Sequence, residues 1–89
     1  MTQQDWLDQL TQEGYKNLNV VSMPANTDFG QHHHPETTVH VILSGELTMT
    51  DEQDSLTLKP GERFTIPAGT THHARCGDEA FSMIVGTLS

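Results

Sequence analysis

A regular alternation of short apolar segments and turn-forming residues runs from Tyr15 to the end of the chain. Each separator contains proline, glycine, asparagine, aspartate or serine, the residues that favour turns. The segments have the length and composition of strands: Asn19 to Met23, Thr38 to Leu43, Glu46 to Thr50, Ser55 to Leu58, Arg63 to Ile66, Thr71 to Cys76 and Ala80 to Leu88. Seven strands at this spacing predict an all-β fold, a small antiparallel sandwich or barrel.

The residues before Tyr15 have the pattern of one short amphipathic helix. Thr2 and Asp5 have the spacing of a capping box, and Gly14 stands where a left-handed helix stop is expected. Apolar residues recur at helical spacing: Trp6, Leu7 and Leu10. We expect a helix from about Gln3 to Glu13 that covers one face of the sheet.

The whole chain, residues 1–89, is expected to form a single domain, with the helix in 1–14 and the barrel in 15–89. A chain of this length buries only about 60–65% of its unfolded surface, so metal binding or dimerisation would help to stabilise it. Thr38 to Leu43 is apolar on both strand faces, and the face that bears Val39 and Val41 needs a cover from the helix or from a second subunit. A homodimer is the prediction that follows.

Charge and cysteine content exclude several classes of partner. Twelve acidic residues against four basic ones give a net charge of −8, which argues against nucleic acids and anionic membranes as partners. Cys76 is the single cysteine, so no internal disulfide forms and a reducing compartment is favoured. Neither a signal peptide nor a membrane-spanning run is present, and we expect a cytoplasmic protein.

Histidines concentrate in the stretch from Gln31 to Gly45 and again after a proline-glycine turn. His32 and His34 are separated by one residue, so on an extended strand both point to the same face. Two imidazoles that converge from one strand suit a borderline divalent metal. The turn Pro67 to Thr70 delivers a further histidine, His72, onto the next strand.

These two segments resemble the two motifs of the cupin family. The second motif, G-x5-P-x-G-x2-H-x3-N, is met by Gly61, Pro67, Gly69 and His72, with Cys76 in place of the asparagine. The first motif, G-x5-H-x-H-x3,4-E-x6-G, is met by His32, His34 and Gly45, with Asn26 in place of the leading glycine and Thr38 in place of the glutamate ligand. The resemblance covers about half of the chain and implies a double-stranded β-helix, or jelly roll.

The resemblance also implies that His32, His34 and His72 bind one divalent transition metal, which would be iron, manganese, nickel, zinc or copper. The alternative is that they are solvated loop histidines or belong to a site that has lost its metal. Thr38 is too short to replace a carboxylate ligand. His40, two residues further on the same face, is either a fourth ligand or a partly buried histidine bonded to a backbone carbonyl.

The function predicted from these residues is a metal-binding cupin that acts as a divalent-metal-dependent enzyme, of dioxygenase or isomerase type, on a small molecule. The alternative is a non-catalytic cupin that binds a metal or ligand as a sensor. His33 and His73 have the opposite strand parity and should point outward. Arg63 and Arg75 either meet an anionic substrate or pair with surface acids, and the acidic run Asp51 to Asp54 is interpreted as a solvated hairpin tip.

Overall fold

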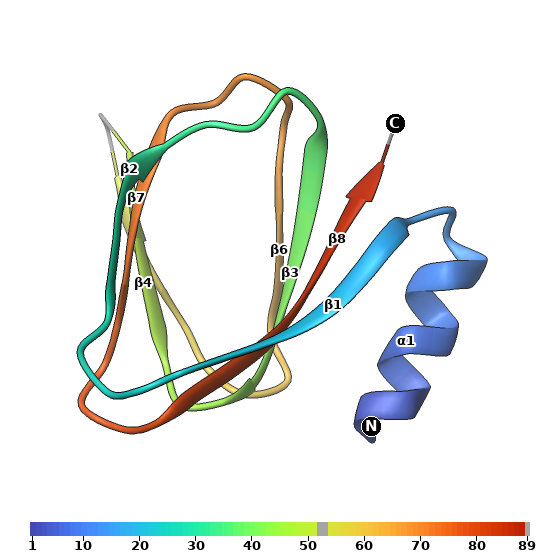
Figure 1. Ribbon diagram of the computed structural model, residues 1–89, viewed down its shortest axis with the longest axis horizontal. Helices are drawn as coiled ribbons and strands as arrows, with labels where there is room; N and C mark the ends of the chain where they lie inside the picture. The colour runs from blue at the N-terminus through green and yellow to red at the C-terminus, as the bar shows by residue number, and fades with distance from the viewer. Residues whose placement is uncertain (52–53, 89) are drawn as a thin grey trace.

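The computed structural model describes residues 1–51 and 54–88, and in this part of the chain one helix precedes eight strands (Figure 1). The elements are α1 (Gln3–Gln12), β1 (Lys16–Met23), β2 (Asp28–His32), β3 (Thr37–Ser44), β4 (Leu47–Thr50), β5 (Ser55–Leu58), β6 (Arg63–Ile66), β7 (His72–Cys76) and β8 (Phe81–Leu88). All the strand pairs are antiparallel. The predicted all-β architecture with one short N-terminal helix is confirmed.

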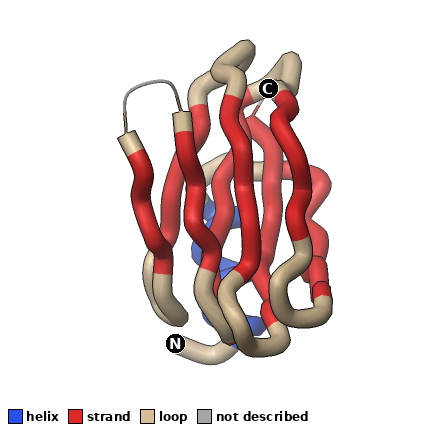
Figure 2. Tube along the Cα trace, turned by 90° about the vertical axis from the view of Figure 1, so that its left-hand side faces the viewer, coloured by secondary structure: helices blue, strands red, loops and turns tan. Residues whose placement is uncertain are grey.

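The strands form two four-stranded sheets that face each other. One sheet has the order β1-β8-β3-β6 and the other the order β2-β7-β4-β5. In Figure 1 the two sheets enclose the interior of a jelly roll, and α1 lies outside, against the sheet that contains β1 and β8. Figure 2 looks onto the β2-β7-β4-β5 sheet, with the helix behind the other sheet.

Strand β2 was missed by the sequence prediction, which placed no strand between Met23 and Thr38. Its five residues include a glycine, and its register with β7 shifts between Asp28 and Gly30. Such a bulge breaks the two-residue alternation on which strand prediction depends. β1 also begins three residues earlier than expected, at Lys16, and Asn17 with φ 55° accompanies a second register shift.

Buried apolar residues lie on both faces of the β1-β8-β3-β6 sheet. Between the sheets they form the interior cluster of Ile42, Leu47, Met49, Leu58, Ile66, Ala74, Cys76, Phe81 and Met83. On the outer face, Val39, Val41 and Ile84 pack with Leu10 of α1. The helix of the same chain therefore covers the second apolar face of β3, which was the reason for predicting a homodimer, and the homodimer itself stays a prediction.

The ends of α1 are built as the sequence predicts. The Thr2 hydroxyl accepts a hydrogen bond from Asp5 N at 3.1 Å, and Thr2 N donates to Asp5 Oδ2 at 2.9 Å, which completes the capping box. Gly14 follows the helix with φ 98°, in the left-handed region. Across residues 1–51 and 54–88, no helix has the length and hydrophobicity needed to cross a membrane.

A bidentate ion pair ties the end of α1 to the edge strand β6. Arg63 donates to Glu13 Oε2 at 2.9 Å and to Oε1 at 2.8 Å, and its guanidinium lies 6.0 Å from the centre of the Tyr15 ring. The hydrogen bonds from Arg63 lower the pKa of Glu13 from its usual 4.5 to about 2. The pair is partly exposed, so solvent screens it.

We expect Glu13→Gln to lower the free energy of unfolding by about 0.2–1 kcal/mol at pH 7. Because the folded-state pKa is depressed, this contribution is present above pH 4.5 and is lost as the pH falls toward 2. Urea unfolding of both proteins across this range checks the prediction. A difference in stability that stays constant down to pH 2 would contradict it. Glu79→Gln, which removes an exposed acid elsewhere, is the charge-matched control.

Candidate metal and ligand site

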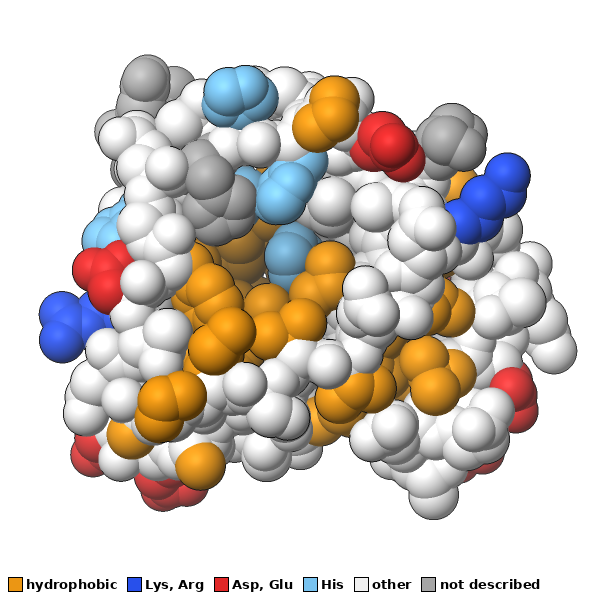
Figure 3. All heavy atoms as spheres, viewed as in Figure 1, with side chains coloured by type: hydrophobic (Ala, Val, Ile, Leu, Met, Phe, Trp, Pro, Cys, Tyr) orange, Lys and Arg blue, Asp and Glu red, His pale blue; other side chains and the backbone are white. Residues whose placement is uncertain are grey.

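A cavity of about 560 Å³ lies between the ends of β4, β5 and β6, at the mouth of the jelly roll. It is lined by Met49, Thr50, Asp51, Asp54, Ser55, Leu56, Phe64, Ile66, Pro67, Thr70 and His72. In the space-filling view the molecule is hollowed here, with hydrophobic side chains in the hollow and histidines beside it (Figure 3). This volume is in the range of sites for small organic molecules.

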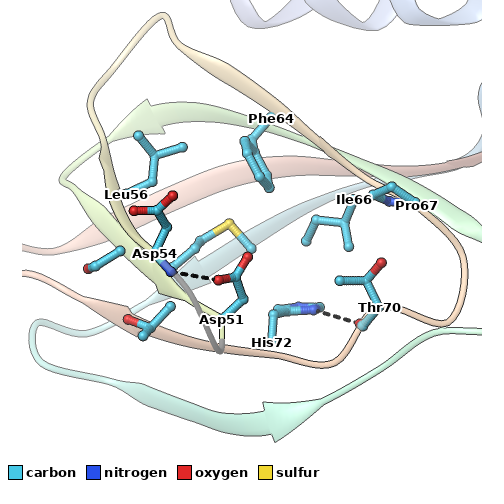
Figure 4. A pocket seen from close by; sticks show the side chains of 11 residues that line it. Asp51, Asp54, Leu56, Phe64, Ile66, Pro67, Thr70 and His72 are labelled. Atoms are coloured by element: carbon cyan, nitrogen blue, oxygen red, sulfur yellow. Dashed lines mark hydrogen bonds between the residues drawn. The ribbon is translucent and has the colours of Figure 1, made fainter.

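His72 lies at the start of β7, where its side chain is buried and lines the cavity (Figure 4). Its Nδ1 atom is 3.3 Å from the backbone carbonyl oxygen of Thr70. A carbonyl oxygen only accepts, so Nδ1 carries the proton of this bond and, in the neutral ring, Nε2 carries the lone pair. Metal-binding histidines are held in this way, with the second nitrogen bonded to a carbonyl or carboxylate.

His34 lies close to His72, although it comes from the loop after β2 and not from the strand itself. The two ring centres are 5.9 Å apart, and the planes are inclined at 35°. The His34 carbonyl accepts a hydrogen bond of 2.8 Å from Gly69 N, which ties this loop to the turn before His72. With a metal–nitrogen bond of 2.0–2.1 Å, two imidazoles on one ion have ring centres about 5.2 Å apart at a tetrahedral angle and about 6.4 Å apart when they lie opposite each other, so the two rings need only a small adjustment to share one ion.

The third predicted ligand, His32, is described only in its backbone. It ends β2 directly opposite His72 in the β2–β7 register, so the main chain brings the two residues together. The side chain of His32 lies outside the described part, and the prediction about it is untested. Among the side chains that the structure describes, no group of three or more histidines, cysteines or acids converges to hold an ion.

His40 and Thr38 both point into the interior from β3, and both are buried. The Thr38 hydroxyl lies 3.1 Å from His40 Nε2. A buried His40 was one of the two interpretations of the sequence, and the hydroxyl of Thr38 is one partner of its ring. Ligation through Nε2 would require this contact to break, and the role of His40 as a fourth ligand stays a prediction.

The comparisons with known proteins agree with the motifs. The family model for the cupin domain matches residues 19–86, about three quarters of the sequence. The chain belongs to the cupin family. A search among curated proteins found no match for this cupin.

Several solved structures resemble this cupin, each with a TM-score above 0.7. A conserved Streptococcus pyogenes protein of unknown function is 29% identical, with 81% of this chain and 62% of that one covered and a TM-score of 0.71. A cupin superfamily protein from Desulfitobacterium hafniense is 25% identical, with 80% and 64% covered and a TM-score of 0.71. A DMSP lyase from Ruegeria pomeroyi is 32% identical, with 81% and 37% covered and a TM-score of 0.74. The cupin chain spans less than two thirds of each of these proteins.

The neighbours of the candidate ligands on β7 face two ways. His73 points outward, as predicted, and its Nε2 lies 2.6 Å from Asp28 Oδ1 on β2. Its hydrogen bond lowers the pKa of Asp28. Cys76 faces the interior and is buried, and burial raises the pKa of its thiol. Cys76 is therefore a small apolar core residue in the cupin, because a thiolate is disfavoured there.

Asp51 and Asp54 are the site residues that sequence reasoning missed. They were interpreted as a solvated hairpin tip, yet both line the cavity (Figure 4). Asp54 N donates to Asp51 Oδ1 at 2.8 Å, so the turn itself fixes the position of this carboxylate. The spacing of two aspartates around a turn was the available signal, but only the folded structure, in which the β4–β5 turn and β6 line one cavity, shows which way they face. Glu52, in the same run, lies outside the described residues.

Proposed function

We propose that this cupin binds a divalent transition metal through His34, His72 and His32 and acts on a small molecule in the adjacent cavity. One observation carries the proposal: His72 is buried in the cavity wall, its Nδ1 is bonded to Thr70, and the ring of His34 stands beside it. A hydrogen bond at one ring nitrogen is how proteins orient a neutral imidazole that binds a metal through the other, which supports the proposal. Iron, manganese, nickel, zinc and copper all accept imidazole ligands.

Other residues of the chain orient the proposed ligands and form the walls of the cavity. The Thr70 carbonyl holds His72 in one tautomer and one orientation. Phe64, Ile66 and Leu56 give the cavity apolar walls that displace water from a bound molecule. When bound, the metal would act as a Lewis acid on a substrate oxygen, and neutral histidine ligands would leave it the full +2 charge, since Thr38 supplies no carboxylate.

An enzyme is favoured over a sensor because the cavity adjoins the proposed ligands. A purely structural metal is enclosed by protein ligands, whereas a catalytic one keeps a position open to substrate. The DMSP lyase among the similar structures is an enzyme on a comparable fold, 32% identical to this chain. We propose chemistry on a small oxygenated molecule, of isomerase, lyase or dioxygenase type, and the non-catalytic sensor remains the alternative.

Elemental analysis of protein purified without an affinity tag tests the proposal. We expect close to one divalent transition-metal ion per chain, and a rise in melting temperature when metal is returned to chelated protein, because binding to the folded state alone stabilises it. Protein that carries no metal and gains no stability from any of the five ions would overturn the proposal. Bound zinc with no redox-active metal would favour the sensor or a hydrolytic role over oxygen chemistry.

A further inference from the structure

Among the described residues, the charged side chains that line the cavity are all acidic. Asp51 and Asp54 are its charged lining residues, and no lysine or arginine is among the described residues that line it. Arg63, a candidate for binding an anionic substrate, is held by Glu13 on the far side of β6. The other three bases are exposed and lie away from the cavity: Lys16, Lys59 and Arg75. Among the described lining residues, an anionic molecule would meet two carboxylates and no basic side chain.

The two carboxylates lie over apolar walls. In Figure 4, Asp51 and Asp54 come from the hairpin on one side, and Phe64 and Ile66 come from β6 across the cavity. A hydrocarbon body with a positive charge satisfies both surfaces, since the alkyl groups contact the apolar walls and the charge is attracted to the acids. The face of an aromatic ring such as Phe64 also attracts a cation.

We propose that the cavity selects a small organic cation, an ammonium compound with a compact alkyl body and an oxygen donor at its other end. The position of the oxygen rests on the proposed function, because the oxygen would point toward the metal at His72. The preference for positive charge does not depend on that function, since it comes from Asp51, Asp54 and the absence of bases among the described lining residues. The protein's net charge of −8 adds to the attraction at long range.

Three probes of nearly equal shape test the charge preference directly. Choline carries a trimethylammonium group, 3,3-dimethyl-1-butanol is its neutral carbon isostere, and 3,3-dimethylbutanoate is the anionic member of the series. NMR titration gives the dissociation constant of each, first with protein as purified and then after metal removal by a chelator. In the chelated protein we expect choline to bind about fivefold more tightly than the neutral alcohol, and with metal bound the preference should be smaller because the ion is itself positive. In the chelated protein the anion should bind most weakly.

Matched variants assign the preference to the two acids. Asp51→Asn and Asp54→Asn remove one charge each, and the amide introduced by Asp51→Asn would keep an oxygen that can accept from Asp54 N, as the carboxylate does now. Each variant should reduce the logarithm of the ratio between the dissociation constants of the alcohol and choline by about half. Asp8→Asn removes one charge from exposed α1, beyond the other sheet, and should leave the preference unchanged. Added salt should weaken choline binding to the unmodified protein and leave the alcohol unaffected, which tests the same point without a variant.

The outcomes separate this inference from the proposed function. A cation preference in protein that binds no metal would support the inference while the metal proposal fails. Metal binding by the purified protein, together with equal affinity for choline and the alcohol or no detectable choline binding after chelation, would overturn the inference alone. Equal loss of preference in the Asp8 and Asp51 variants would also overturn it, because the effect would then come from net charge and not from the cavity.

Discussion

The His72→Ala variant is expected to lose a hundredfold or more of the affinity for a divalent metal, whereas His73→Ala, its neighbour on β7, should keep it. Removing groups that only support a metal ligand typically costs 10–100-fold, and loss of a ligand itself should cost at least as much. His72 is buried in the cavity wall and held by Thr70, while His73 points outward to Asp28. Isothermal titration with zinc or manganese measures both affinities.

Stability measurements distinguish a variant that has lost a metal ligand from one that has lost affinity because it folds poorly. The quantity compared is the gain in unfolding free energy on adding metal, about 2.7 kcal/mol when free metal is a hundredfold above the dissociation constant. This gain should vanish in His72→Ala and in His34→Ala, and should persist in His73→Ala and in His33→Ala, because His33 is exposed. Equal metal-induced gains in the His33 and His34 variants would contradict the site.

The pH dependence of metal affinity tests whether the ligands are histidines, and the His40→Ala variant tests whether His40 is one of them. Each histidine ligand must be neutral, so affinity should fall as the pH drops through about 6.5, where free imidazole is protonated. If His40 is a fourth ligand, His40→Ala lowers the affinity clearly. If instead it is a core residue bonded to the Thr38 hydroxyl, the variant loses core stability and little metal affinity.

Most of the fold followed from local patterns in the sequence. The capping box of Thr2 and Asp5 and the turn residues between strands are short-range signals, and the helix and seven strands that they predict are present. β2 has no such signal, because its bulge at Asp28–Gly30 interrupts the alternation. Which element covers Val39 and Val41 was open as well, since apolar faces indicate burial but not the identity of the partner.

The candidate site was only partly predictable for a different reason. The motif spacing predicted His34 and His72 as ligands of one site, and their rings lie side by side. Strand parity was the stated argument for His34, yet that residue sits in the loop after β2, and the hydrogen bond from Gly69 to its carbonyl is what positions that loop. Asp51 and Asp54 line the cavity together with residues of β6 and β7, a long-range arrangement that local spacing does not encode.

The Leu10→Ala variant should lose about 2–5 kcal/mol of unfolding free energy, the range for truncating a fully buried leucine. Leu10 is completely buried, and it packs from α1 onto Val39, Val41 and Ile84 of the sheet. The loss combines apolar surface that returns to water with the cavity left beneath the helix. Urea unfolding monitored by the fluorescence of Trp6, which packs against the same cluster, measures it.

Leu88→Ala is the matched control, because the same side-chain atoms are removed from a residue that is 40% exposed, and it should cost less than about 1 kcal/mol. Protein concentration distinguishes the two possible covers of the outer face. If α1 of the same chain is the cover, the loss in Leu10→Ala is the same at low and high concentration. If a second subunit covers this face in solution, the loss changes with concentration, since dissociation then contributes to unfolding. Sedimentation of the unmodified protein at micromolar concentration tests the homodimer separately. A dimer whose Leu10→Ala loss is independent of concentration would have to associate through another surface, because α1 already covers Val39 and Val41.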